Sequence, residues 1–291
     1  MLHSCEDLRV LVVAAQTRTQ FGAMALFLAS LGWSPSPLEK KYAQNPTDIS
    51  RAQLPASFAT AENIALIFHG RGGPDRETDD LKARFLAQDA AVGLNRAVEV
   101  YNWEEYLEGT DRVGYTGQAL GRKFGKILAQ NRALRSLHVV GTSAGSFISD
   151  ATCSAYVAEA GDSRACVRLS LTDPITVRGG EELGDGWGLR NFGADCDFAE
   201  HYLNTDDIVP STNIPLQRCH VYDVTGCAER ASFPPPDSGN FLQDLGLRML
   251  GYHNWPMGYL ARHYETVLDA DGNVVHPTHE EKKRGEIVFV R

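Results

Sequence analysis

Short apolar segments recur along the chain, separated by longer stretches in which apolar residues follow a helical spacing. Residues 117–130 carry apolar side chains on one helical face, and residues 145–160 form a helical segment that ends before Gly161. Such alternation is typical of helices that cover a mainly parallel sheet, so the pattern predicts an α/β fold. The segments with the composition of buried strands are residues 64–68, 97–101, 137–140, 167–171, 201–203 and 220–224.

The region before these strands is also apolar, but it lacks the pattern of a membrane span or a signal peptide. Polar residues at 16–20 interrupt residues 10–33, whereas a spanning helix needs about 20 consecutive apolar residues. Acidic residues stand at positions 6 and 7, where a signal peptide carries positive charge. We expect a buried strand at residues 8–15 and a helix at residues 21–31. A cytoplasmic location is then the default, and secretion stays open.

Composition narrows the range of functions. The chain has 291 residues without a repeat or a Pro/Gly-rich linker, and we expect a single domain over residues 1–291. The formal net charge of −9 and the scattered Lys and Arg residues argue against binding to nucleic acid. The six cysteines include no CxxC pair, which argues against a thiolate metal site. A disulfide between Cys219 and Cys227 stays open for an exported form.

A Gly-x-Ser-x-Gly motif lies where a predicted strand meets a predicted helix. Gly141 and Gly145 flank the turn, in which a side chain at either position would collide with neighbouring backbone. So tight a turn lifts the hydroxyl of Ser143 above the sheet, at the positive end of the helix dipole. There the negative charge that develops on an attacked carbonyl group is stabilised. The sequence therefore predicts Ser143 as a nucleophile.

A second glycine-rich motif follows the strand at residues 64–68. It occupies residues 69–73 with the sequence HGRGG, and such a loop lets backbone N–H groups approach a tetrahedral oxyanion. We predict that the N–H groups of Arg71 and Ala144 form an oxyanion hole. His69 is then expected to shape the loop rather than to act as a base.

A nucleophilic serine needs a histidine as base and a carboxylate that orients the histidine. His253 lies after the last core strand and before a helical pattern at residues 257–264, and the chain order nucleophile, acid, histidine requires a late base. Asp173 and Asp206 each follow a predicted strand, so either can reach a histidine at the carboxyl edge of the sheet. Histidines within the strands are expected to be interior residues: His138, His201 and His220.

These motifs together resemble the α/β-hydrolase family, and within it the lipase group of the pancreatic-lipase and phospholipase A1 type. The resemblance implies an α/β-hydrolase fold with a Ser-Asp-His triad. In lipases of this type the acid follows the sixth strand, which corresponds to Asp173, whereas in much of the wider family it follows the seventh, which corresponds to Asp206. We take Asp173 as the predicted acid and Asp206 as the alternative. The resemblance rests on residues 69–73, 141–145 and 171–174, and on His253 with Trp255-Pro256.

The predicted activity is hydrolysis of carboxylic esters through an acyl-enzyme. The enzyme would be of the lipase or esterase type, with a small-molecule or lipid ester as substrate. Ser143, Asp173 and His253 carry the reaction, which needs no metal and no other cofactor. Transient contact with a lipid surface fits this activity. A thioesterase or an acyltransferase would use the same triad. The alternative of another class is a non-catalytic protein of this fold that binds a ligand or a partner.

Two long connections are expected to shape the substrate pocket. Residues 225–252 contain an apolar, helix-like piece at 241–250, and residues 179–197 are rich in glycine. Long insertions at the carboxyl edge of such sheets commonly border the pocket. We predict a lid at residues 225–252, with a surface helix packed on the core as the alternative, and a second wall at residues 179–197.

Overall fold

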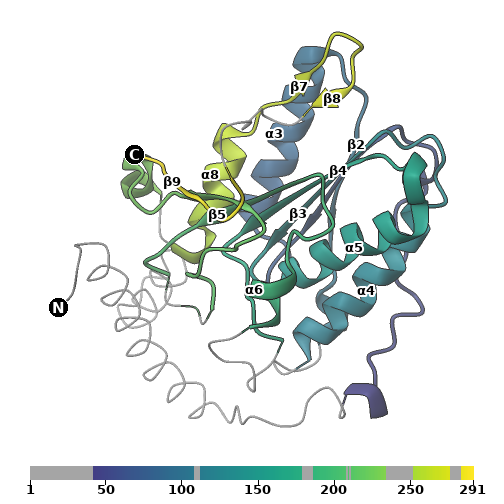
Figure 1. Cartoon of the computed structure of the whole chain (residues 1–291), viewed down its shortest axis with the longest axis horizontal. Coiled ribbons are helices and arrows are strands. Elements are labelled where there is room, and N and C mark those ends of the chain that lie inside the picture. The colour runs from purple at the N-terminus through teal and green to yellow at the C-terminus, as the bar shows by residue number, and fades with distance from the viewer. Residues whose placement is uncertain are drawn as a thin grey trace.

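The chain forms a central sheet with helices on both faces (Figure 1). The computed structural model describes residues 42–107, 112–178, 186–207, 209, 211–233, 252–275 and 283–291. The strand and helix expected before residue 42 lie outside these residues, and so does most of the predicted lid, residues 234–251. Among the described residues, no helix is long and apolar enough to cross a membrane.

The central sheet is parallel throughout its described part, with the strand order β2-β1-β3-β4-β5-β6-β9. Each segment between residues 64 and 224 that was predicted as a buried strand is present, and the mainly parallel sheet is confirmed. This arrangement is an α/β-hydrolase fold. The strands are β1 Asn63–Phe68, β2 Ala97–Tyr101, β3 Ser136–Thr142, β4 Cys166–Thr172, β5 Phe198–Leu203, β6 His220–Asp223 and β9 Ile287–Phe289, and a separate hairpin consists of β7 Val267–Leu268 and β8 Val274–Val275.

Two pairs of helices cover the two faces of the sheet (Figure 1). Alternate residues of β1 point to opposite faces: Leu66 and Phe68 pack in the core under α4 and α5, whereas Ala65 and Ile67 pack under α3 and α8. Burial on both faces accounts for the uninterrupted apolar residues of β1 from Ile64 to Phe68. The helices are α3 Arg76–Val92, α4 Val113–Leu128, α5 Gly145–Ala160, the short α6 Trp187–Asn191 and α8 Trp255–His263.

Helices α4 and α5 pack unusually closely because glycines face the neighbouring backbone. A Cβ atom at Gly121 would lie 2.4 Å from the carbonyl oxygen of Ile148, and one at Gly125 would lie 2.5 Å from that of Thr152. No larger residue fits at this separation without a shift of one helix. The position of α5 on the sheet is thereby set, and with it the position of the turn at its N-terminus.

Helix α3 follows the glycine-rich loop directly, although the apolar pattern did not indicate a helix there. The side chain of Asp75 accepts a hydrogen bond from the N–H of Thr78 at 2.9 Å, and the hydroxyl of Thr78 accepts one from the N–H of Asp75 at 3.0 Å. This reciprocal cap fixes the start of the helix. Its buried apolar side chains are Leu81 and Phe85, too few to form a stripe that the sequence reveals.

Candidate active site

Ser143 lies in a strained turn between β3 and α5. Its φ of 51° falls in the left-handed region, which disfavours a residue other than glycine by about 1–3 kcal/mol. Three backbone hydrogen bonds hold this conformation: the N–H of Ser143 donates to the oxygen of Thr172 at 3.1 Å, and its oxygen accepts from the N–H groups of Ser146 and Ile175, each at 3.2 Å. The end of β4 therefore supports the turn that carries the hydroxyl.

The glycines around Ser143 meet the steric demand that the motif predicts. A Cβ atom at Gly141 would lie 2.7 Å from the carbonyl oxygen of Gly145, and one at Gly145 would lie 2.5 Å from that of Phe68. A Cβ atom at Gly70 would lie 3.0 Å from the Cβ of Ser143. The glycine-rich loop is thus packed directly against the turn.

His69 organises the glycine-rich loop. Its Nε2 accepts a hydrogen bond from the N–H of Trp103 at 3.1 Å, so the proton is on Nδ1, which donates to the oxygen of Gly70 at 2.6 Å. The indole N–H of Trp103 donates to the oxygen of His69 at 2.9 Å. Burial lowers the pKa of His69, which favours the neutral ring. These contacts fit the loop-shaping part expected for this histidine.

The proposed oxyanion donors lie on the two segments that meet at Ser143. Ala144 precedes α5, and an N–H group at the start of a helix has no acceptor within the helix. Arg71 lies in the loop between Gly70, which contacts Ser143, and two glycines with φ of 105° and 90°, Gly72 and Gly73. The side chain of Arg71 is exposed, and the proposed contribution of this residue comes from its backbone N–H group.

His253 is buried in a 3-10 helix, Tyr252–Asn254, that precedes α8. Its Nδ1 is 2.5 Å from Oδ2 of Asp207. Its Nε2 is buried and has no hydrogen-bond partner among the described residues. A histidine held at Nδ1 with an unengaged Nε2 is arranged to accept a proton from a neighbouring group.

Asp207 supplies this partner, although nothing in the sequence distinguishes it from the adjacent acid Asp206. Its carboxylate also accepts hydrogen bonds from the hydroxyl of Thr212 at 2.5 Å and from the N–H of Val209 at 3.0 Å. Burial acts to raise the pKa of Asp207, but the charge of His253 and these hydrogen bonds outweigh it and lower the pKa. The carboxylate of Asp207 is therefore ionised at neutral pH.

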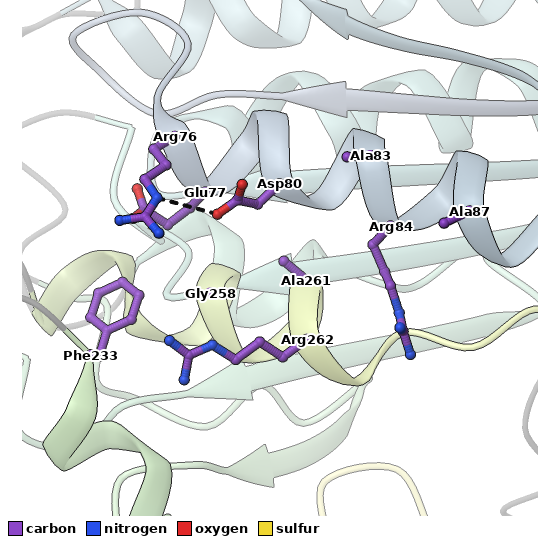
Figure 2. A pocket seen from close by; sticks show the side chains of 10 residues that line it. All are labelled: Arg76, Glu77, Asp80, Ala83, Arg84, Ala87, Phe233, Gly258, Ala261 and Arg262. Atoms are coloured by element: carbon purple, nitrogen blue, oxygen red, sulfur yellow. Dashed lines mark ion pairs between the residues drawn. The ribbon is translucent and has the colours of Figure 1, made fainter.

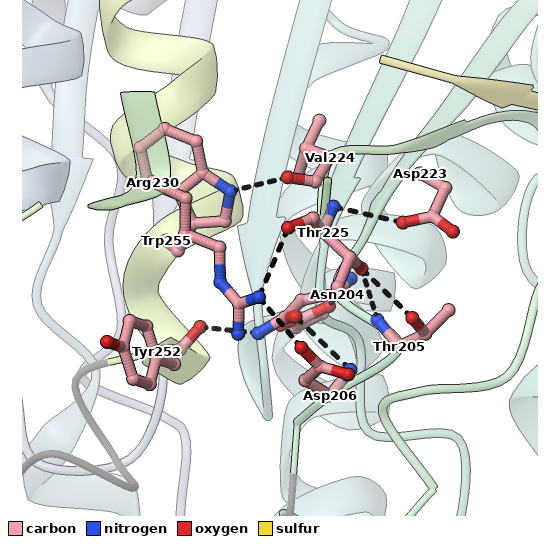
Figure 3. Close-up of polar contacts among 10 residues, drawn as sticks. Asn204, Thr205, Asp206, Asp223, Val224, Thr225, Arg230, Tyr252 and Trp255 are labelled. Atoms are coloured by element: carbon pink, nitrogen blue, oxygen red, sulfur yellow. Dashed lines mark hydrogen bonds and ion pairs between the residues drawn. The ribbon is translucent and has the colours of Figure 1, made fainter. Parts of the chain in front are cut away.

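Asp206, the alternative acid, pairs with Arg230, whereas His253 pairs with Asp207. The side chain of Asp206 is 63% exposed, and its carboxylate accepts a hydrogen bond from the guanidinium group of Arg230 at 2.8 Å (Figure 3). Neighbouring residues of a turn face different directions, so only one residue of the Asp206-Asp207 pair faces the site. The motif itself does not tell which one, because both are acids at the same strand end.

Asp173, the predicted acid, lies in the site but does not contact the histidine by a hydrogen bond. Its Oδ1 accepts from the N–H of Asn204 at 2.8 Å, and its Oδ2 has no partner among the described residues. One polar atom each of Asp173, Asp207 and His253 lie within 4.8 Å of one another. The structure thus corrects the predicted pairing: His253 is hydrogen-bonded to Asp207, while Asp173 stands beside the pair.

The same three side chains have a spacing that a metal ion would accept. Two of the candidate ligand atoms, Nδ1 of His253 and Oδ2 of Asp207, are already hydrogen-bonded to each other. A metal at these atoms would have to break that hydrogen bond. The arrangement serves proton transfer through His253 better than metal binding.

Contacts from several segments hold the turn of His253 in place (Figure 3). The amide of Asn204 donates to the oxygen of Tyr252 at 2.8 Å, and the indole N–H of Trp255 donates to the oxygen of Val224 at 2.9 Å. The guanidinium group of Arg230 lies 4.6 Å from the centroid of the Tyr252 ring. The ends of β5 and β6 thereby fix a histidine that is distant from both in sequence.

A cavity of about 390 Å³ lies between α3 and α8 (Figure 2). None of the predicted site residues lines it. Asn254 connects the two places, because its amide is 3.4 Å from a carboxylate oxygen of Asp75 and 3.5 Å from one of Glu77. The lining residues are Arg76, Glu77, Asp80, Ala83, Arg84, Ala87, Phe233, Gly258, Ala261 and Arg262.

Comparisons with known proteins assign the chain to no family. No protein-family model matches it, and no curated protein matches it. Among solved structures, it is similar to a propionate-bound thermophilic esterase from the Planctomycetes species Thermogutta terrifontis, with 14% identity and a TM-score of 0.31 over 70% of this chain and 84% of that chain. The native form of that esterase is similar with 15% identity and a TM-score of 0.24, over 56% of this chain and 59% of that chain.

Proposed function

We propose that the protein is a serine hydrolase of the lipase or esterase type, which cleaves carboxylic esters. The observation that carries the proposal is the buried pair of His253 and Asp207 with an unengaged Nε2, at the sheet edge where the strained turn holds Ser143. The strain at Ser143 and the buried unpaired nitrogen of His253 both cost stability, and catalysis by the pair would explain why the two are kept at one edge of the sheet.

The reaction proceeds by acyl transfer in two steps. Nε2 of His253 takes the proton of the Ser143 hydroxyl while the oxygen attacks the ester carbonyl carbon. The imidazolium ring then donates that proton to the departing alcohol, which leaves the acyl group on Ser143. Water, deprotonated by the same nitrogen, attacks the acyl-enzyme and releases the acid. Asp207 holds Nδ1 and stabilises the charged ring throughout.

Backbone N–H groups stabilise the oxyanion in this mechanism. We propose the N–H groups of Ala144 and Arg71 as donors, because the first lies at the start of α5 and the second follows Gly70, which contacts Ser143. Loss of one such donor lowers kcat by roughly 10²–10³-fold in serine hydrolases. The close contact between Gly70 and Ser143 supports this position of the loop.

Hydrolysis of p-nitrophenyl esters from two to sixteen carbons tests the proposal. We expect turnover by the wild type, no turnover by Ser143→Ala, and unchanged turnover by the control Ser154→Ala, which alters a half-buried serine on the same helix. A preference for long acyl chains would indicate a lipase, and a preference for short chains an esterase. Acyl thioesters in the same panel separate a thioesterase. A fluorophosphonate that fails to label Ser143 would refute the catalytic proposal altogether.

A further inference from the structure

The site holds two carboxyl groups where a triad needs one. Asp173 follows β4 and Asp207 follows β5, and these strands are hydrogen-bonded neighbours in the sheet. Both residues are almost completely buried, with exposed fractions of 0% and 1%. A polar atom of each lies within 4.8 Å of the other and of a ring nitrogen of His253. The second acid therefore belongs to the site and needs an explanation there.

The two acids differ in the partners available for a negative charge. Asp207 accepts hydrogen bonds from His253, Thr212 and Val209, whereas Asp173 accepts one from Asn204. Two buried carboxyl groups at this separation do not both ionise, and the charge resides where the donors are. In agreement with this distribution of donors, burial and then the charge of Asp207 raise the pKa of Asp173 well above its usual value. The resting site thus contains an ionised Asp207 and a neutral Asp173.

The backbone alone does not account for an acid at position 173. Asp173 has a φ of 39°, a conformation that glycine adopts more readily. Its N–H donates to the oxygen of Tyr202 at 3.1 Å, and an asparagine would satisfy the N–H of Asn204 as well as an aspartate does. What only an acid adds is the ability to become charged next to His253.

We propose that Asp173 is a reserve positioning residue, which takes over the orientation of His253 when Asp207 is absent. This inference rests on the proposed function for its kinetic readout. Without the charge of Asp207, the carboxyl group of Asp173 releases its proton to water and the resulting carboxylate accepts the N–H of His253. The room left by the Asp207 side chain lets the two groups approach.

A double-mutant cycle tests the takeover. We compare kcat/KM for the wild type, Asp173→Asn, Asp207→Ala and the double variant, with a p-nitrophenyl ester as substrate. Asp173→Asn alone should change kcat/KM by less than about threefold, but in the Asp207→Ala background it should lower kcat/KM by a further tenfold or more. Asp206→Asn is the matched control and should have the same small effect in both backgrounds, because Asp206 bonds to Arg230.

Equal effects of Asp173→Asn in both backgrounds would overturn the proposal, because a purely structural residue acts alike in each. A second readout does not depend on turnover: the low-field proton resonance of Nδ1–H of His253, bonded to a carboxylate, should persist in Asp207→Ala and vanish in the double variant. If the resonance behaves so while the wild type cleaves no ester, the proposed function fails and the reserve acid stands. Should Asp207→Ala not fold, Asp207→Ser leaves similar room and replaces it.

Discussion

The nucleophile side of the site, residues 69–73 and 141–145, is built differently from the histidine side, residues 204–207 and 252–255. On the first, glycines bring backbone segments into contact, and the turn of Ser143 is held by backbone hydrogen bonds. On the second, side chains make the decisive contacts, among them Asn204 to Tyr252 and Asp207 to His253. Steric fit positions the nucleophile, and a network of polar side chains positions the base. The two sides should therefore fail in different ways when they are altered.

The largest effect is expected on the histidine side, from Asp207→Asn. The amide oxygen keeps the contact to the N–H of Val209, but the NH2 group takes the place of Oδ2, which accepts from both Thr212 and Nδ1 of His253, so kcat should fall by roughly 10³–10⁴-fold. We expect a smaller loss for Asp207→Ala, because only the alanine leaves room for Asp173. Steady-state kinetics measure both, and Asp206→Asn serves as the control with less than about a twofold change. A larger loss in the alanine variant would contradict the distinction.

The contrast also explains which parts of the site could be predicted from sequence. The nucleophile turn and the glycine-rich loop depend on glycine at particular positions of a contiguous motif, and a motif is visible in one sequence. The partner of His253 depends instead on which of two adjacent acids, Asp206 or Asp207, faces inward. Arg230 pairs with Asp206 and Thr212 donates to Asp207, and these contacts hold the two acids in different directions. Neither Arg230 nor Thr212 belongs to a motif that the sequence reveals.

The fold could be predicted for a similar reason. Strands in a sheet that is covered on both faces are rich in apolar residues, and all of the strands predicted between residues 64 and 224 appear in the sheet. Helix α3 could not be predicted in this way. Its start depends on the reciprocal cap of Asp75 and Thr78, and its buried apolar residues, Leu81 and Phe85, are too few to form a visible pattern. Its place against α8 follows from tertiary packing rather than from a periodic pattern.

On the nucleophile side, Gly145→Ala should combine a loss of stability with a loss of activity. The added Cβ would lie 2.5 Å from the oxygen of Phe68 and 2.7 Å from that of His69, and backbone at both points must shift. We expect the free energy of unfolding to fall by about 1–3 kcal/mol and kcat to fall by roughly 10–100-fold as the oxyanion donors move. Chemical denaturation and kinetics on the same sample measure the two effects.

Gly226→Ala is the matched control for this substitution. A Cβ atom there would meet only the oxygen of Val290, at an ordinary 3.7 Å. Its stability should stay within about 0.5 kcal/mol of the wild type. If Gly145→Ala behaved like this control, the close packing of the loop on the turn would not be what positions the nucleophile.

A smaller effect is expected from Asn204→Ala, which removes one support of the histidine turn. The oxygen of Tyr252 loses its donor, and the turn gains freedom while Asp207 and His253 remain intact. The free energy of unfolding should fall by about 1–2 kcal/mol, and kcat should fall by roughly tenfold because the base is less well oriented. Thr205→Ala, which alters an exposed neighbouring contact, should leave kcat unchanged. An unchanged kcat in Asn204→Ala would assign the orientation of His253 to Asp207 alone.

The smallest effect distinguishes the two acids by the pH dependence of stability. The pKa of Asp173 is raised in the folded protein, so above the ordinary value of 3.8 the unfolded chain releases a proton that the folded chain retains, and stability falls as the pH rises. The pKa of Asp207 is lowered, so its contribution to stability is present above 3.8 and is lost as the pH falls through the folded value. Asp173→Asn should therefore match the wild-type Tm at about pH 3 and exceed it progressively at higher pH, whereas Asp207→Asn should fall below it at neutral pH and approach it in acid. Thermal unfolding of the three proteins between about pH 3 and pH 8 measures this, and a difference for Asp173→Asn that stays constant with pH would mean that Asp173 carries its charge in the resting site.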